Sequence, residues 1–205
     1  GHPGNDAAVW QSPEARRADF NLAARRMYSV AEVAERGADV RFVLDALERE
    51  PPSWLPRSAS ARVGVIGIGL GAQTTQWLLG EQMARNLAPV VERRVRAVAL
   101  LGPYVGFEGP AMHQRYGAIT TPMLLAYGLT ETDPYGLGMT SQQRRAMVDL
   151  LVNARVIEVR LPAVSLATLL TPGSEPPPAE TARGLPPLPS GGTTPRGEPP
   201  TRGGR

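Results

Sequence analysis

Apolar and polar positions follow two patterns along the chain, one typical of helices and one typical of buried strands. The helical pattern repeats apolar or small residues at intervals of three and four, at Val33, Gly37, Val40, Leu44 and Leu47. Ser29 and Glu32 precede this repeat with the spacing of a capping box, and Pro51 follows it. The pattern predicts a helix over about 30–49.

Four short runs of consecutive apolar residues are typical of buried strands. They span residues 62–67, 94–101, 121–128 and 155–161. Helical patterns separate these runs, over about 73–85 and from Thr140 to about 153. Strands that alternate with helices form a parallel sheet, and strands without polar alternation are covered on both faces. We therefore expect an α/β fold, a three-layer domain with a mostly parallel sheet of about four strands and helices on both faces.

The last 34 residues, 172–205, have a different composition, with 10 Pro, 7 Gly and no aromatic residue. Such a segment buries too little apolar surface to offset the entropy lost on ordering. We expect a folded domain over 1–171 and a disordered Pro/Gly-rich tail over 172–205. The LPPLP run at 185–189 has the character of a polyproline II ligand, although tails of this kind are more often inert.

Composition excludes several kinds of site. The chain of 205 residues has no cysteine, which rules out disulfides, thiol nucleophiles and Cys-ligated metals. Only His2 and His113 are available as imidazole bases. A net charge of +3 does not indicate nucleic-acid binding, and no apolar run approaches the roughly 20 residues of a membrane span. We expect a soluble protein with no metal, cofactor or nucleic-acid partner; its compartment stays open because Gly1 suggests a processed or trimmed amino terminus.

A glycine-rich turn after the first strand is the most informative segment, since residues 63–72 read VGVIGIGLGA. Gly67, Gly69 and Ala72 fit a dinucleotide-binding turn, but the end of the next strand lacks the acidic residue that such a site needs. Gly67 and Gly71 also match the outer positions of a nucleophile elbow, G-x-S-x-G, whose central serine is here Gly69. The third interpretation is a tight strand–helix turn without a chemical role.

Five segments then follow one another in an order that is found in one enzyme superfamily. They are GHPGNDAA at 1–8, RGADVRFVLDALE at 36–48, RVGVIGIGLGA at 62–72, RVRAVALLGP at 94–103 and ITTPMLLAYGLTETDP at 119–134. This series resembles the α/β-hydrolase superfamily, in its dienelactone-hydrolase-, cutinase- and platelet-activating-factor-acetylhydrolase-like branch. Family members place further strands and an oxyanion loop before the HPG segment. The resemblance therefore implies an amino-terminally truncated hydrolase sheet.

The resemblance also implies that the catalytic residues are replaced. The family's nucleophilic serine falls on Gly69, and its histidine falls on Leu166. The family's acid falls on Glu131, with Asp133 as a near alternative, and one backbone oxyanion donor falls on Leu70. Acyl transfer by this route needs a nucleophile and a base. We therefore expect a pseudoenzyme with a hydrolase-like fold.

Two functions from different classes remain open. In the first, the chain is a non-catalytic structural or protein-binding subunit, and another protein chain covers the edge of the 62–67 strand or binds the Pro-rich tail. We expect this edge to be unpaired, because the strands that lie beside it in the family are missing, and proteins normally cover such edges. In the alternative, the chain is an active serine-ester-hydrolase-type or nucleotide-binding protein that uses the turn from Gly67 to Gly71 as an anion site.

Overall fold

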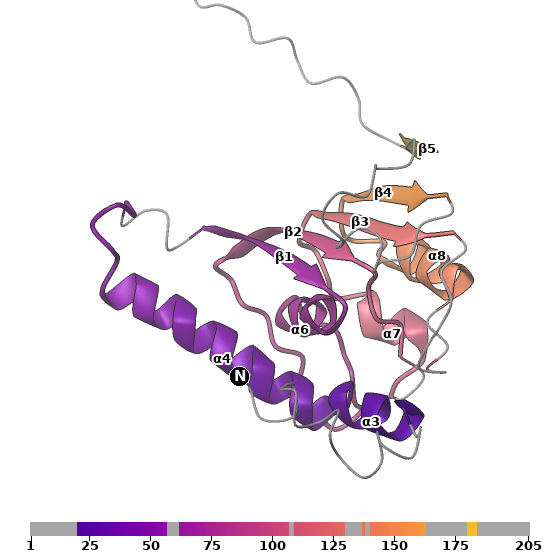
Figure 1. The fold of residues 1–205 in the computed structure, drawn as a ribbon, viewed down its shortest axis with the longest axis horizontal. Helices are drawn as coiled ribbons and strands as arrows, with labels where there is room; N and C mark the ends of the chain where they lie inside the picture. Colours follow the sequence, from indigo (N-terminus) through magenta and orange to yellow (C-terminus); the bar gives the residue numbers. More distant parts are fainter. Residues whose placement is uncertain are drawn as a thin grey trace, which may run out of the picture.

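Parallel strands form the centre of the fold: β1 (Val63–Ile68), β2 (Val95–Leu101), β3 (Met123–Gly128) and β4 (Val156–Leu161). A short strand, β5 (Glu180–Arg183), pairs antiparallel with β4, so that the strand order is β1-β2-β3-β4-β5 (Figure 1). The computed structural model describes residues 20–56, 62–106, 109–129, 137, 140–162 and 180–183. The α/β fold and the mostly parallel sheet of about four strands are confirmed.

The described helices are α3 (Phe20–Met27), α4 (Val30–Arg49), α6 (Leu70–Leu78), α7 (Met112–Tyr116) and α8 (Ser141–Leu150). Helix α4 confirms the helix expected over 30–49, and the Ser29 hydroxyl accepts a hydrogen bond from the Glu32 N–H at its start. Helix α8 begins at a complete capping box of Thr140 and Gln143. Helix α6 is shorter than the expected helix at 73–85, because Gly80 takes a left-handed conformation with φ 97° and ends it.

The described helices lie on one side of the sheet (Figure 1); α6 and α8 pack directly against it, and α4 packs on α6. The four parallel strands lie side by side in chain order, and right-handed crossovers between such strands place every connecting helix on the same side. The helical layer expected on the second face is not found in the described part of the chain, so the three-layer arrangement stays a prediction. That second face carries an apolar row of directly paired residues, Ile66, Ala99, Leu124 and Ile157.

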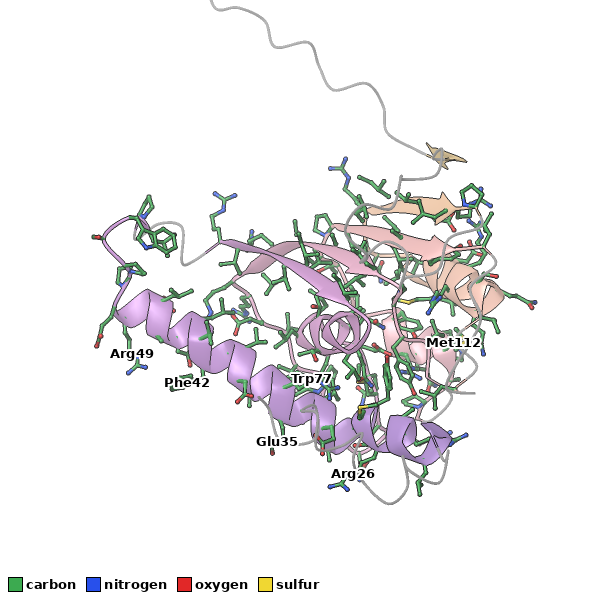
Figure 2. The ribbon with its side chains drawn as sticks, viewed as in Figure 1. Arg26, Glu35, Phe42, Arg49, Trp77 and Met112 are labelled. Atoms are coloured by element: carbon green, nitrogen blue, oxygen red, sulfur yellow. The ribbon has the colours of Figure 1, made fainter. Side chains whose placement is uncertain are left out.

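The main core lies between the sheet and helices α6, α7 and α8. It contains, among others, the buried residues Leu79, Leu100, Tyr116, Leu125 and Met147. A second contact joins α4 to α6, where Trp77 lies between the two helices (Figure 2). A Cβ atom added at Gly37 would lie 2.1 Å from the Trp77 ring, so glycine is required for this approach. Trp77 is thus a core residue.

Only Glu180–Arg183 of the expected tail belongs to the described residues, and these residues form β5. The sequence patterns did not indicate this strand. The LPPLP run at 185–189 and the expected domain boundary at 171 lie outside the described residues. Within the described ranges, no helix combines the length and apolar character needed to span a membrane.

Candidate functional site

The candidate site is the turn between β1 and α6, and Gly69 forms its apex. Gly69 has φ 54° and ψ −113°, a left-handed conformation that favours glycine. Its N–H donates to the Leu101 carbonyl at 3.2 Å, and its carbonyl accepts from the Gln73 N–H at 3.1 Å. The turn is therefore fixed to both β2 and α6. This sharp strand-to-helix turn resembles a nucleophile elbow, but the residue at its apex has no side chain.

The three glycines of the turn meet different constraints. A Cβ atom at Gly67 would lie 2.6 Å from the Gly71 carbonyl oxygen and 2.7 Å from the Thr75 hydroxyl. Gly67 is thus required for the close approach of β1 and α6. A Cβ atom at Gly71 would meet nothing within 4 Å, and one at Gly69 would meet only the Tyr28 hydroxyl, at 3.9 Å. Space is therefore available for a side chain at Gly69, and only the backbone conformation favours glycine there.

Two tyrosines lie beside this turn, and the sequence analysis did not identify them. The rings of Tyr28 and Tyr104 stack with their centroids 4.6 Å apart and their planes at 27°. Like Leu70, the first residue of α6, both pack against a small buried cluster of Ala24, Met27 and Leu137. Tyr104 follows the carboxyl end of β2, the end at which open α/β sheets bind ligands. This position in the sequence could have identified Tyr104 as a candidate site residue.

A buried arginine holds Tyr28 in place. Arg36 donates hydrogen bonds to the Met27 carbonyl (2.9 Å), to Gln73 Oε1 (2.7 Å) and to Thr74 Oγ1 (3.0 Å). Gln73 in turn donates to the Tyr28 carbonyl at 2.7 Å. Burial lowers the pKa of Arg36 from its ordinary value, because the charged form loses its hydration. This network joins α4, α6 and the segment between α3 and α4, so its role is positioning.

A second buried network holds the segment that carries Tyr104. Gln76 donates from Nε2 to the Tyr104 carbonyl (2.8 Å) and accepts from the Tyr104 N–H (3.1 Å). Gln76 also donates to Glu81, which forms a buried ion pair with Arg115. Arg115 donates to the Gly106 carbonyl as well. Burial raises the pKa of the Glu81 carboxyl, and the Arg115 guanidinium acts in the opposite direction. The hydrogen bonds of these side chains hold the loop after β2 in place.

The remaining predicted site residues do not assemble around Gly69 in the described structure. His113 lies on α7 and is exposed. The proposed acid positions, Glu131 and Asp133, lie outside the described residues, as do Leu166 and His2. Within the described ranges, no group of three His, Asp or Glu side chains is placed to hold a metal ion.

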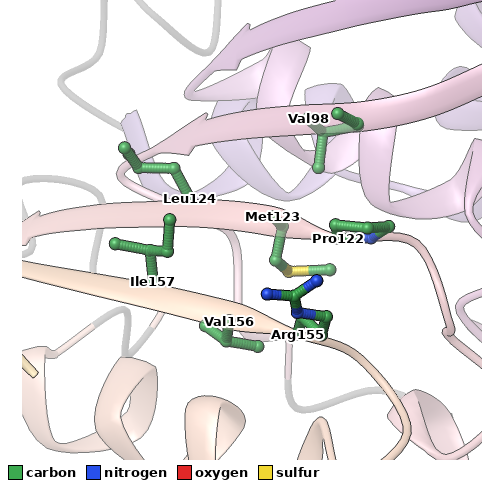
Figure 3. Close-up of a pocket in the computed structure, with 8 residues that line it drawn as sticks. Val98, Pro122, Met123, Leu124, Arg155, Val156 and Ile157 are labelled. Atoms are coloured by element: carbon green, nitrogen blue, oxygen red, sulfur yellow. The ribbon is translucent and has the colours of Figure 1, made fainter. Parts of the chain in front are cut away.

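Described residues line two grooves, of which the second reaches the turn at Gly71. The first, of about 520 Å³, lies where β2, β3 and β4 begin and is lined by Met123, Leu124, Arg155 and Ile157, among others (Figure 3). This is the amino end of the strands, opposite to the end at which open α/β sheets bind ligands. The second, of about 340 Å³, lies between α4, α6 and β1. Its lining includes Val40, Val65, Ile66 and Leu78.

Comparisons with known proteins identify no family for the chain. No protein-family model matches it. No curated protein sequence matches it either. Among solved structures, it is similar to the crystal structure of a variant of SOBER1 from Arabidopsis thaliana, with 17% sequence identity and a TM-score of 0.44. The similarity covers 67% of this chain and 58% of that chain, which is less than two thirds of its length. A likeness at this level indicates no function.

Proposed function

We propose that this chain is a non-catalytic α/β domain that acts as a structural or protein-binding subunit. The observation that carries the proposal is Gly69 at the apex of the β1–α6 turn. The resemblance to α/β-hydrolases places the nucleophile at this position, and the turn has the sharp geometry that a nucleophile needs. Glycine offers no oxygen or sulfur to attack a carbonyl. Acyl transfer at this turn would lack its first step.

The edge of β1 is the proposed binding surface. Within the described sheet, β1 is a terminal strand, and its sequence VGVIGI contains no charge and no proline. Ile66 in its middle is 73% exposed. Natural edge strands are usually protected by charges, prolines or covering segments, since their free backbone groups pair readily with other strands. These features support the addition of a partner's strand to β1.

The catalytic part of the proposal is tested with a small ester. We expect purified protein to hydrolyse p-nitrophenyl acetate at the rate of a protein-free blank. The Glu131→Gln variant serves as a control, because it removes the remaining family acid, and it should behave identically. Hydrolysis well above the blank that Glu131→Gln abolishes would contradict the proposal.

The binding part is tested with a photo-crosslinking amino acid at position 66, in cells that naturally produce the chain. Val152 is the matched control, because it is 74% exposed and lies after α8. We expect position 66, and not position 152, to crosslink to one defined segment of a protein chain. The absence of any crosslink from position 66 would contradict the proposal.

The alternative function, anion or nucleotide binding at the turn from Gly67 to Gly71, has one observation in its favour. Gly69 gives the backbone the sharp turn that opens directly into α6, whose amino terminus attracts negative charge. A ligand that binds only the folded protein raises the melting temperature. We expect no shift with NAD, FAD or ATP at millimolar concentration. A reproducible rise with one of them would favour the alternative.

A further inference from the structure

Three exposed arginines lie at the amino end of the sheet, the end opposite to the β1–α6 turn. Arg62 directly precedes β1, Arg96 is the second residue of β2, and Arg155 directly precedes β4. Adjacent strands lie about 4.8 Å apart, so these residues span about 14 Å from β1 to β4. We refer to Arg62, Arg96 and Arg155 as the arginine set.

The carboxylates near the start of β2 are already paired with a different arginine. Arg94 donates two hydrogen bonds to Glu92, each of 2.8 Å, and its guanidinium also lies 2.7 Å from Asp45 and 3.2 Å from Glu48 of α4. In the described part of the chain, no carboxylate forms an ion pair with a member of the arginine set. The arginine set therefore carries positive charge that attracts an anionic partner.

An apolar groove lies beside the arginine set. It is the groove of about 520 Å³ described above, and Arg155 is one of its lining residues (Figure 3). Arg96 directly precedes Ala97, another lining residue, and Ala97 is paired in the sheet with Gly64, two residues after Arg62. Apart from Arg155, the described residues that line the groove are all apolar. Aliphatic side chains are the groups that such a lining buries favourably.

We infer that this surface binds an acidic segment of another protein, whose carboxylates pair with the arginine set and whose apolar side chains enter the groove. The span of about 14 Å corresponds to about five residues of an extended segment at about 3.3 Å each. Carboxylates and aliphatic side chains that alternate along such a segment point to opposite sides of it. The inference goes beyond the proposed function, because it concerns the amino end of the sheet and not the edge of β1.

The groove favours a protein segment over other polyanions. Single-stranded nucleic acids are held by basic grooves in which bases stack on aromatic side chains, and the described lining contains no aromatic residue. Elements that insert into an anionic membrane carry apolar side chains that protrude into the lipid, whereas the apolar residues here line a hollow. Only a partner with both carboxylates and aliphatic side chains satisfies the two parts of this surface.

The first test uses a fluorescein-labelled peptide of ten residues in which Glu and Leu alternate, and binding is measured by fluorescence anisotropy. We expect this peptide to bind at least about tenfold more tightly than a Glu–Ser peptide, which keeps the charge, and a Lys–Leu peptide, which keeps the apolar residues. Raising NaCl from about 50 to about 500 mM should weaken binding about tenfold, because salt screens exposed charges.

The second test removes the charge of the surface. Arg96→Gln combined with Arg155→Gln should weaken binding of the Glu–Leu peptide about tenfold or more. The matched control is Arg26→Gln combined with Arg49→Gln, which removes the same charge from exposed positions on α3 and α4 and should leave the affinity unchanged. Far-UV circular dichroism verifies that both variants are folded.

The third test fills the groove and keeps the arginines. Ala97→Trp places a large side chain at an exposed position of the groove lining and should weaken binding of the Glu–Leu peptide about tenfold or more. Ala31→Trp is the matched control, because Ala31 is exposed on the first turn of α4, and it should bind like the wild type.

The outcomes decide between this inference and its alternatives. A wild type that does not bind the Glu–Leu peptide, or binding that survives the loss of Arg96 and Arg155 or the filling of the groove by Ala97→Trp, overturns the inference. Tighter binding of a (dT)20 oligonucleotide or of phosphatidylserine vesicles to the same arginines would assign the surface to nucleic acid or lipid and would also overturn it. None of these results bears on ester hydrolysis or on crosslinking from position 66, so the proposed function is tested separately.

Discussion

At the scale of single residues, the three glycines of the β1–α6 turn are equivalent in the sequence motif but not in the structure. Gly67 is constrained by contact with Thr75 and the Gly71 carbonyl, whereas Gly69 is constrained by its left-handed backbone. Gly71 is constrained by neither. The motif could not separate these roles, because the contact at Gly67 depends on how closely the helix packs on the strand.

This difference leads to a paired prediction for stability. Gly67→Ala should lower the free energy of unfolding by about 1–3 kcal/mol, because the added methyl group overlaps α6. Gly71→Ala should leave it unchanged or raise it by up to about 1 kcal/mol, because alanine favours the helix and has room. Urea unfolding followed by circular dichroism measures both. Equal effects of the two substitutions would refute the packing argument.

A carboxylate near the start of β2 makes stability depend on pH. Hydrogen bonds from Arg94 hold the pKa of the Glu92 carboxyl below its ordinary value. A lowered pKa in the folded state contributes stability that is present above the unfolded pKa of about 4.3 and is lost as the pH falls through the folded value. The cost of Glu92→Gln in unfolding free energy should therefore shrink between pH 7 and pH 3. Denaturant unfolding at several pH values checks this, and a cost that stays constant would contradict it.

At the scale of elements, the local patterns predicted most of the fold. Apolar spacing and the Ser29 cap identified α4, the apolar runs identified β1 to β4, and Thr140 identified the start of α8. Helix α7 has only five residues, too few for a periodic signal, and β5 lies within the Pro/Gly-rich segment. The position of the described helices on one side of the sheet could not be predicted, because it depends on the order of the strands, which long-range pairing decides. The stacking of Tyr28 on Tyr104 could not be predicted either, because it also depends on contacts between segments far apart in the sequence.

The Glu81–Arg115 pair gives a test at this scale, because it joins the end of α6 to α7 and the loop after β2. Removing one partner leaves a buried charge alone, at a cost of about 3–5 kcal/mol. Arg115→Met should therefore destabilise strongly, and adding Glu81→Gln should recover part of the loss. Thermal unfolding of the single and double variants measures the coupling. A double variant no more stable than Arg115→Met would mean that the charge is not the cause.

At the scale of the whole molecule, the sequence predicted a glycine at the apex of the turn and the edge position of β1, and the described sheet has both features. The sequence could not predict what surrounds Gly69. The Tyr28 hydroxyl lies 3.9 Å from the position of a Cβ atom there, and the neighbouring polar side chains Gln73 and Gln76 are committed to backbone groups. The side chains around Gly69 therefore hold the backbone in place.

Restoring the family's residues should therefore not restore catalysis. According to the resemblance, Gly69→Ser combined with Leu166→His would supply a nucleophile and a base, and the Leu70 N–H would be one oxyanion donor. A single donor is a poor oxyanion site. We expect the double variant to hydrolyse p-nitrophenyl acetate no faster than Gly69→Ser alone. Clear turnover that requires both substitutions would show that the site is complete.

In the function proposed above, the edge of β1, rather than a catalytic site, is the surface through which this chain acts. Hydrogen exchange of the β1 backbone amides, measured on the natively isolated assembly, tests it most directly, because each residue reports its own hydrogen bond. The N–H groups of Val63 and Gly69 donate to carbonyls of the segment that contains β2, and backbone groups alternate in direction along a strand, so the amides of Val65 and Gly67 point toward β2 and that of Ile66 points away. We predict that the amide of Ile66 is protected as strongly as those of Val65 and Gly67. Rapid exchange at Ile66 beside protected amides at Val65 and Gly67 would mean that the edge is free, and would contradict the account.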